Sequence, residues 1–147
     1  MVDLDTPPAP RPDAETAPYW EATAEGRMVL GRCRECRRWL HPPREACPTC
    51  AGPVGFEAVS GRGTVFSFIT VHQPTVPGYL RELPYSAALV EIDEQPGVRL
   101  PARLAGGAGA HVQIGDRVTL ELAELAGSDY RVPVARPVAD DIGADSA

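Results

Sequence analysis

From residue 60 onward, apolar and polar positions alternate in short runs that turn residues separate. The runs RGTVFSFITVH and YSAALVEID have the period of two that is typical of strands with one buried face. Glycine, often beside Pro, Asp or Ser, marks the turns between the runs. The pattern therefore predicts strands near residues 62–72, 85–93, 98–104, 117–125 and 130–135.

Five short strands that follow a small cysteine-bearing segment indicate a partly open Greek-key barrel of the OB type. The first predicted strand is the longest, and a long loop over residues 73–84 joins it to the second; both features suit that barrel. A small β-sandwich or an SH3-like barrel is the alternative. We expect the barrel to occupy residues 58–136.

Ahead of the barrel, the segment ETAPYWEATAEG predicts a short helix over about residues 14–25. Thr16 suits the N-cap of this helix, and Gly26 suits its end. Tyr19 and Trp20 give the helix one aromatic face. Because a single short helix is marginal alone, that face must dock on its own domain or on a partner protein.

The two ends of the chain differ from its middle. Residues 1–12 hold four Pro and two Asp, so we expect them to be disordered, and residues 137–147 form an acidic tail. The N-terminal stretch lacks the basic start and apolar run of a signal peptide, and no stretch approaches the roughly 20 apolar residues that span a bilayer. We therefore expect a cytoplasmic protein that makes no membrane contact.

Charge and cysteine content narrow the possible functions. The net charge is −6 and the pI is about 5.0. Because non-specific nucleic-acid binding needs clustered positive charge, this composition argues against a nucleic-acid partner. In the cytoplasm, four cysteines are more often metal ligands than disulfides, so the cysteines become the main candidate for chemistry.

Two CxxC pairs carry the strongest chemical signal. Cys33-Arg-Glu-Cys36 and Cys47-Pro-Thr-Cys50 are separated by ten residues. Each pair can offer two thiolates from one tight turn, and two such turns complete the tetrahedron that Zn²⁺ accepts. Iron also fits four thiolates, and two redox dithiols or disulfides are the non-metal alternative. We predict one structural zinc per chain, because four protein ligands leave no position for water or substrate.

Two further features surround the cysteines. His41 lies between the pairs as a rival ligand, although four thiolates already satisfy the ion. Five arginines also lie nearby, namely Arg32, Arg34, Arg37, Arg38 and Arg44. They could bind phosphate, or they could offset the negative charge of a zinc ion with four thiolates, and the two roles are compatible.

The order of these features resembles that of one family. The segments PYWEATAEGR, MVLGRC, CRECRRWLHPPREACPTCAG, VSGRGTVFSFITVH and PYSAALVEID are similar to those of zinc-ribbon/OB-fold proteins associated with acyl-CoA metabolism, long filed as a domain of unknown function. The resemblance runs from about Pro18 to about Leu125. Two departures are visible: Arg37 stands where the family often has Gly, and Phe56 where it often has Trp. The fold class is then mainly β, with an N-terminal helix and rubredoxin-like zinc ribbon (residues 13–57) before a five-stranded OB-type barrel.

The resemblance implies that the chain is not an enzyme on its own. Such proteins pair in hetero-oligomers with thiolase-superfamily proteins: thiolases, hydroxymethylglutaryl-CoA synthases, acyltransferases and the retro-aldolases that shorten steroid side chains. They stabilise or orient the large subunit and help to shape the acyl-CoA channel. In the steroid case the aldolase cleaves a 17-hydroxy acyl-CoA to propionyl-CoA and a 17-ketosteroid. Basic residues that are all Arg suggest a GC-rich genome, which suits an actinobacterium and makes the aldolase the first expectation.

Other functions remain open from the sequence. The chain could be a stand-alone or shuttling acyl-CoA-binding protein, or an accessory subunit of a thiolase or acyltransferase. It holds no GxSxG and no P-loop motif, which agrees with the absence of catalysis by the chain alone. His72, at the end of the first barrel strand, is the one tempting base, and a plain surface role is its simpler interpretation.

The remaining candidate contacts lie in two loops. Arg62, within Ser60-Gly-Arg-Gly63, could approach a phosphate, although that segment also suits a tight entry from ribbon to barrel. The loop 73–84 is longer than the usual 2–6 residues and carries apolar side chains, so it either faces the partner and substrate channel or caps the barrel. The candidate contacts with acyl-CoA or a partner are thus Arg38, Arg44, Arg62, His72, Tyr79 and Leu80.

Overall fold

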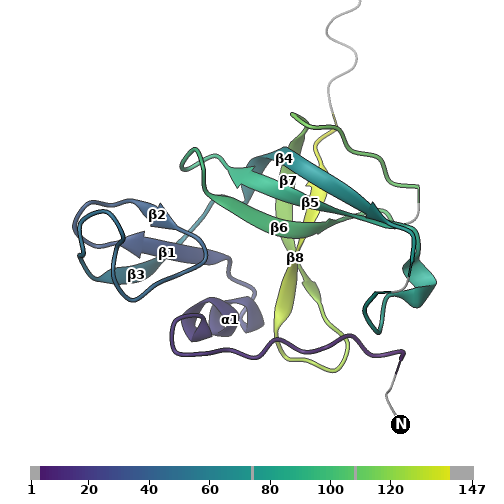
Figure 1. Cartoon of the computed structure of the whole chain (residues 1–147), viewed down its shortest axis with the longest axis horizontal. Helices are drawn as coiled ribbons and strands as arrows, with labels where there is room; N and C mark the ends of the chain where they lie inside the picture. Colours follow the sequence, from purple (N-terminus) through teal and green to yellow (C-terminus); the bar gives the residue numbers. More distant parts are fainter. Residues whose placement is uncertain (1–3, 74, 108, 140–147) are drawn as a thin grey trace, which may run out of the picture.

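The computed structural model describes residues 4–73, 75–107 and 109–139. Within these ranges, one α-helix and a three-stranded sheet precede a closed barrel of five strands (Figure 1). The predicted fold class is therefore confirmed: the chain is mainly β, with helix, ribbon and OB-type barrel in that order. No helix in the described ranges has the length and apolar character that a membrane crossing requires.

Helix α1, Ala17–Ala24, is shorter at both ends than the predicted 14–25. Thr16 occupies the N-cap position, but its side chain makes no capping hydrogen bond to the helix. The chain leaves the helix through Gly26, whose φ of 80° is the left-handed conformation expected of a glycine at a helix end.

The aromatic face of α1 docks on the chain's own domain. Tyr19 is buried, and its ring centroid lies 4.9 Å from that of Trp20. Trp20 in turn lies 6.0 Å from Tyr130, which precedes the last barrel strand. The Thr23 hydroxyl is fully buried and accepts a hydrogen bond from the Arg131 N–H (3.3 Å).

The ribbon is a small antiparallel sheet with β1, Val29–Cys33, in its centre. Strand β2, Trp39–Leu40, pairs with one edge of β1, and β3, Val54–Ala58, pairs with the other. From the sequence, the segment RMVLGR (residues 27–32) predicts a short strand that leads into the cysteines, which corresponds to β1, but no strand is predicted at β3. The VGFEA segment of β3 is half-buried at four successive positions, so it lacks the alternation that marks strands such as β5 and β6 of the barrel.

The barrel consists of β4 (Arg62–Val71), β5 (Tyr85–Ile92), β6 (Arg99–Leu104), β7 (Arg117–Glu124) and β8 (Arg131–Pro137). Its strands follow the order β4-β5-β6-β8-β7, and β7 returns to β4. All neighbours are antiparallel except β6 and β8, which run parallel. The barrel is closed where the sequence predicts a partly open one, but the parallel seam has only two residue pairs, Arg103↔Val134 and Leu104↔Ala135.

A continuous core joins the barrel to the ribbon. Val65, Val90, Leu100 and Val118 fill the barrel with at most 1% of their surface exposed, and the same core cluster includes Leu30 of β1. These four side chains come from four different strands, and each occupies a position that points into the barrel.

The Gln95 side chain, in the turn between β5 and β6, links the ribbon to the barrel. The Gln95 amide accepts a hydrogen bond from the Trp39 N–H (2.9 Å) and donates one to the Trp39 carbonyl (3.1 Å). This pair of bonds imitates a strand pairing and fixes β2 against the β5–β6 turn.

The N-terminal segment runs along the molecule toward the loop before β5 (Figure 1). The Leu4 carbonyl accepts a hydrogen bond from the Gly78 N–H (2.9 Å), and Pro7 is buried. Disorder of residues 1–12 stays a prediction, and residues 1–3 lie outside the described residues. Of the predicted acidic tail, 137–147, the part from residue 140 onward also lies outside them.

Candidate functional site

The four cysteines form one cluster at the end of the ribbon. Cys33 ends β1, and Cys36 follows it in a tight turn; Cys47 and Cys50 flank a second turn. All four sulfur atoms lie within 4.8 Å of one another, with Cys33–Cys50 at 3.5 Å and Cys36–Cys47 at 3.7 Å. A tetrahedral zinc with bonds of about 2.3 Å places its sulfurs about 3.8 Å apart. The cluster therefore fits one zinc ion.

The two turns have matching backbone geometry. The N–H groups of Cys36, Thr49 and Gly52 each donate to a cysteine sulfur at 3.4 Å. The residue after each pair is left-handed, with φ of 64° at Arg37 and 61° at Ala51. These bonds direct positive ends of peptide dipoles at the sulfurs and so favour their thiolate form.

The pKa values of the metal-free thiols indicate that the cysteine cluster favours a bound cation. The N–H groups of Cys50 and Thr49 lower the pKa of Cys47 to about 6. At Cys50 the Gly52 N–H acts in the same direction, but the neighbouring cysteines and burial raise the pKa to about 11. The cluster thus resists full ionisation without a counter-charge, and a zinc ion supplies that charge when it binds. Because all four ligands come from the protein, such a zinc is structural.

The arginines around the cluster have different contacts. Arg32 and Arg37 both reach Glu57 on β3, at 3.4 Å and 2.9 Å. The hydrogen bond from Arg37, with support from Arg32, lowers the pKa of Glu57. Arg38 and Arg44 are exposed, and neither has an ion-pair partner within the part of the chain that the structure describes. A role for these two in contacting acyl-CoA or a partner stays a prediction.

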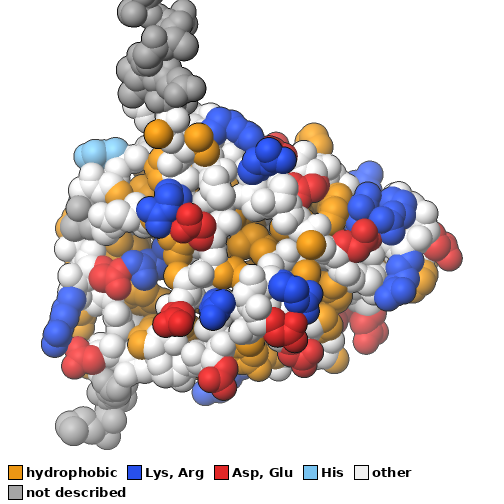
Figure 2. All heavy atoms as spheres, turned by 180° about the vertical axis from the view of Figure 1, so that it is seen from behind, with side chains coloured by type: hydrophobic (Ala, Val, Ile, Leu, Met, Phe, Trp, Pro, Cys, Tyr) orange, Lys and Arg blue, Asp and Glu red, His pale blue; other side chains and the backbone are white. Residues whose placement is uncertain are grey.

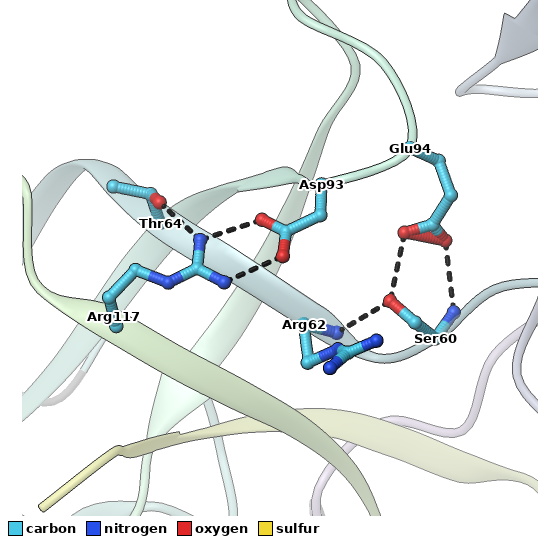
Figure 3. Close-up of polar contacts among 6 residues, drawn as sticks. All are labelled: Ser60, Arg62, Thr64, Asp93, Glu94 and Arg117. Carbon is cyan, nitrogen blue, oxygen red and sulfur yellow. Dashed lines mark hydrogen bonds and ion pairs between the residues drawn. The ribbon is translucent and has the colours of Figure 1, made fainter.

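The entry from ribbon to barrel is a closed polar network (Figure 3). Glu94 accepts hydrogen bonds from the Ser60 N–H and hydroxyl, both at 2.9 Å, and the Ser60 hydroxyl accepts one from the Arg62 N–H (3.1 Å). Beside it, Arg117 binds Asp93 through two bonds of 2.6 Å and lowers the pKa of that carboxyl. These contacts give the Ser60–Gly63 segment a structural role, while a contact of the Arg62 side chain with phosphate stays a prediction.

The predicted contact residues do not form one site. Arg62 begins β4 and His72 follows its other end, so about 30 Å of strand separates them. Tyr79 and Leu80 lie near the His72 end: Leu80 is 41% exposed, whereas the Tyr79 ring packs 5.6 Å from Tyr85. Charges of both signs are interspersed over the face shown in Figure 2, which offers no single basic surface to nucleic acid.

Sequence reasoning missed Arg103, which organises the region around the loop before β5, and it did not predict the contact that His41 makes. Arg103 on β6 forms an ion pair with Glu82 and lies over the rings of Tyr79 (4.8 Å) and Tyr85 (5.4 Å). His41 is not part of the cysteine cluster; its ring lies 5.9 Å from that of Tyr19. Neither contact has a signal in the sequence, because the partners are about 20 residues apart or more along the chain.

Family models match most of the described chain. The ChsH2 rubredoxin-like zinc ribbon domain matches residues 20–57, and the ChsH2 C-terminal OB-fold domain matches residues 56–123. The ribbon match covers all four cysteines, and the second match covers most of the barrel.

Proteins of three organisms have sequences similar to this one. The probable enoyl-CoA hydratase alpha subunit of Thermomonospora curvata is 38% identical over 132 residues, which is 88% of this chain and 40% of the relative. The 3-oxo-4,17-pregnadiene-20-carboxyl-CoA hydratase alpha subunit of Mycobacterium tuberculosis is 38% identical over 116 residues, 77% of this chain and 36% of the relative. A DUF35 domain-containing scaffold protein of Methanocaldococcus jannaschii is 30% identical over 102 residues, 67% of this chain and 70% of the relative. The chain thus spans at most 40% of the length of the two hydratase subunits.

Solved structures agree with the same grouping. A chain of the structure described as Ltp2-ChsH2(DUF35) aldolase matches with a TM-score of 0.77 and 36% identity, over 87% of this chain and 98% of that one. A DUF35 protein of unknown function from Sulfolobus solfataricus matches with a TM-score of 0.53 over 83% of this chain and 87% of that one. At 15% identity, the second match supports the fold alone.

Proposed function

The chain belongs to the DUF35 family, with the ribbon and barrel of ChsH2, and we propose that it is a non-catalytic accessory subunit of a thiolase-superfamily enzyme. The observation that carries this proposal is the match to the Ltp2-ChsH2(DUF35) aldolase, which covers 98% of the matched chain at 36% identity. Our first choice of reaction is cleavage of a 17-hydroxy steroid side-chain acyl-CoA to a 17-ketosteroid and propionyl-CoA in the cytoplasm.

The chemistry of the named relatives supports the steroid assignment. Addition of water across the 17(20) double bond of 3-oxo-4,17-pregnadiene-20-carboxyl-CoA, the compound in the name of one relative, gives a 17-hydroxy thioester. In that product the hydroxyl is β to the thioester carbonyl. Loss of the hydroxyl proton can therefore form the 17-ketone while the C17–C20 bond breaks, and C20 takes a proton to give propionyl-CoA. An aldolase and a hydratase with related subunits would thus catalyse successive steps.

This chain's own residues suit a supporting role. Catalysis of acyl cleavage needs a positioned acid or base. His72, the candidate base from the sequence, is exposed at a strand end, and His41 is packed against Tyr19. What the chain offers instead is a rigid module: a ribbon with the ligands for one zinc, locked to a barrel through Gln95 and Trp39.

Co-expression with the thiolase-superfamily protein of the same genome tests the proposal. We expect the two chains to co-purify, and we expect 17-hydroxy-3-oxo-4-pregnene-20-carboxyl-CoA to be cleaved by the complex and not by this chain alone. Cleavage by the isolated chain, a partner that is fully active without it, or failure of the two chains to associate would contradict the proposal.

Two controls separate the alternatives. Hydration of 3-oxo-4,17-pregnadiene-20-carboxyl-CoA by the same complex would favour a hydratase role, which the identity to hydratase alpha subunits makes worth testing. Tight binding of acyl-CoA by the isolated chain, without a stable complex, would favour a stand-alone or shuttling protein. A thiolase or acyltransferase partner would show as thiolysis or acyl transfer in place of aldol cleavage.

A further inference from the structure

A pocket of about 330 Å³ lies where the helix, the ribbon and the barrel meet. Its walls are mainly aromatic and proline side chains from separate segments of the chain: Tyr19 and Trp20 of α1, His41 of the ribbon, Tyr79 before β5, and Pro101 and Pro133 of the barrel. Neither the cysteine cluster nor the exposed candidate arginines belong to this junction pocket.

The pocket exists because the barrel wall is split there. Strands β6 and β8 pair only through Arg103 and Leu104 with Val134 and Ala135, so the earlier residues of both strands diverge. Pro101 and Pro133 line this gap, and neither has an N–H that could donate across it. In Figure 1, the beginning of β8 lies apart from β6 and near α1. Tyr19 and Trp20 of α1 line the space between them.

Two polar atoms in the wall lack partners. Among the described residues, His41 Nδ1 and Arg103 Nε are buried and make no hydrogen bond, and both residues line the junction pocket. Leaving a buried donor or acceptor unsatisfied costs about 1–3 kcal/mol. Both atoms lie just behind the pocket surface, so a ligand oxygen reaches the Arg103 Nε–H, or His41 Nδ1 in the tautomer that carries its proton there, after a small movement of the neighbouring side chains.

The charges around the pocket set the charge of its ligand. Arg103 is compensated by its ion pair with Glu82. Burial lowers the pKa of His41, so its ring is neutral near pH 7. Tyr19 stays protonated, because burial raises its pKa to about 12. No uncompensated positive charge lines the described pocket, so a carboxylate has no advantage over a neutral group.

We propose that the junction pocket binds a small, neutral, mainly apolar ring compound with a carbonyl oxygen that accepts a hydrogen bond at Arg103 or His41. A volume of about 330 Å³ corresponds to about ten waters at roughly 30 Å³ each, which is room for one or two fused rings. The rings of Trp20 and Tyr79 supply flat apolar walls. This inference goes beyond the proposed function, since the binding needs no partner subunit.

Binding of simple ring compounds to the full-length, zinc-loaded chain tests the proposal. The probes are 1-tetralone, which is a neutral ketone, tetralin, which has the same rings without oxygen, and 5,6,7,8-tetrahydro-1-naphthoate, which is an anion. In NMR titrations we expect 1-tetralone to bind about 2–10-fold more tightly than tetralin, as one hydrogen bond predicts, and the anion to bind more weakly than the ketone. Shifts of backbone amides should concentrate at the lining residues.

Three variants make the test specific. Ala87 is a small residue of the pocket wall. Its replacement in Ala87→Leu should abolish binding, because the larger side chain fills the pocket. His41→Phe keeps a ring but removes the polar atoms, so the preference for 1-tetralone over tetralin should shrink. His72→Phe is the matched control, because His72 is exposed and lies outside the pocket, and it should change nothing.

Two results would overturn the proposal. The first is failure of all three probes to bind the wild-type chain up to their solubility limits, which would mean that water alone occupies the pocket. The second is binding of 1-tetralone with shifts away from the lining residues. If Ala87→Leu loses zinc or folds poorly, the location of the amide shifts in the wild-type chain tests the proposal instead: shifts at the lining residues support it, and shifts elsewhere contradict it.

Discussion

The two residues that follow the CxxC pairs adopt a conformation that side chains disfavour. Arg37 has φ of 64° and Ala51 has φ of 61°, and in each turn this residue's N–H donates back to the carbonyl of the first cysteine. The left-handed conformation costs a non-glycine residue roughly 1–2 kcal/mol. At Arg37 the ion pair with Glu57 provides some compensation, whereas Ala51 is exposed and has no such contact.

We expect Ala51→Gly to stabilise the zinc-loaded chain by about 0.5–1 kcal/mol, because glycine removes the steric cost of the positive φ. Urea unfolding followed by circular dichroism measures this difference. Ala46→Gly is the matched control: Ala46 is an exposed alanine of the same ribbon without a positive φ, so this change should lower stability slightly. Equal effects of the two substitutions would contradict the strain at Ala51.

Individual contacts are the part of the molecule that the sequence predicts least. The spacing of the cysteines is enough to indicate their cluster, since two tight turns need only one ion between them. The pairing of Arg32 and Arg37 with Glu57 depends on β3 lying beside β1, and β3 itself is not predicted. The family's frequent Gly at position 37 is a hint of the left-handed turn, but only the backbone shows it.

At the scale of elements, periodicity predicts the barrel well. Each barrel strand is predicted to within two residues. Buried and more exposed positions alternate along β5 and β6, whereas β8 does not alternate and is located by the turn residues Gly127-Ser128-Asp129 before it. Alternation fails for β3, where successive residues are half-buried, and for the two-residue β2. The closing of the barrel cannot be predicted in this way, because a pattern along one strand does not specify its neighbour.

The ribbon should depend on zinc for its folding. We expect about one zinc per chain by elemental analysis, and Cys47→Ser should lose metal and solubility together. Apparent binding energies of structural zinc are about 10–16 kcal/mol, more than the few apolar residues between the cysteines can replace. Arg38→Ser, an exposed change beside the first CxxC pair, is the control and should keep its zinc. A wild-type chain that is folded without metal would refute this dependence.

At the scale of the whole molecule, the loop 73–84 is the candidate surface for contact with the proposed partner. The loop 73–84 is tied down at several points: Gly78 binds Leu4, and Tyr79 lies between Tyr85 and Arg103. Leu80 is different, because its side chain is 41% exposed on a short 3₁₀ turn. The sequence could not separate the two residues, since both are apolar neighbours in one loop.

Tyr79→Ala and Leu80→Ala should therefore behave differently. Tyr79→Ala should cost about 1–2 kcal/mol of stability, because it removes a ring pair and a cation–π contact. Leu80→Ala should leave the melting temperature of the isolated chain nearly unchanged and weaken the complex with the thiolase-superfamily protein.

Ile114→Ala, at an exposed apolar residue of another loop, is the control for Leu80→Ala and should affect neither property. Binding is measured by calorimetry and stability by thermal unfolding. If Leu80→Ala lowers the melting temperature and binds the partner normally, the loop caps the barrel and is not an interface.

The short seam between β6 and β8 also determines where the native molecule opens first. Only two residue pairs close the barrel there, whereas β4 and β5 share eight paired positions and β7 and β8 share seven. Fluctuations that separate β6 from β8 break few bonds, so amide protons of this seam should exchange with solvent faster than those between β4 and β5. The barrel can therefore open transiently between β6 and β8 into a curved sheet, while its antiparallel strands remain paired.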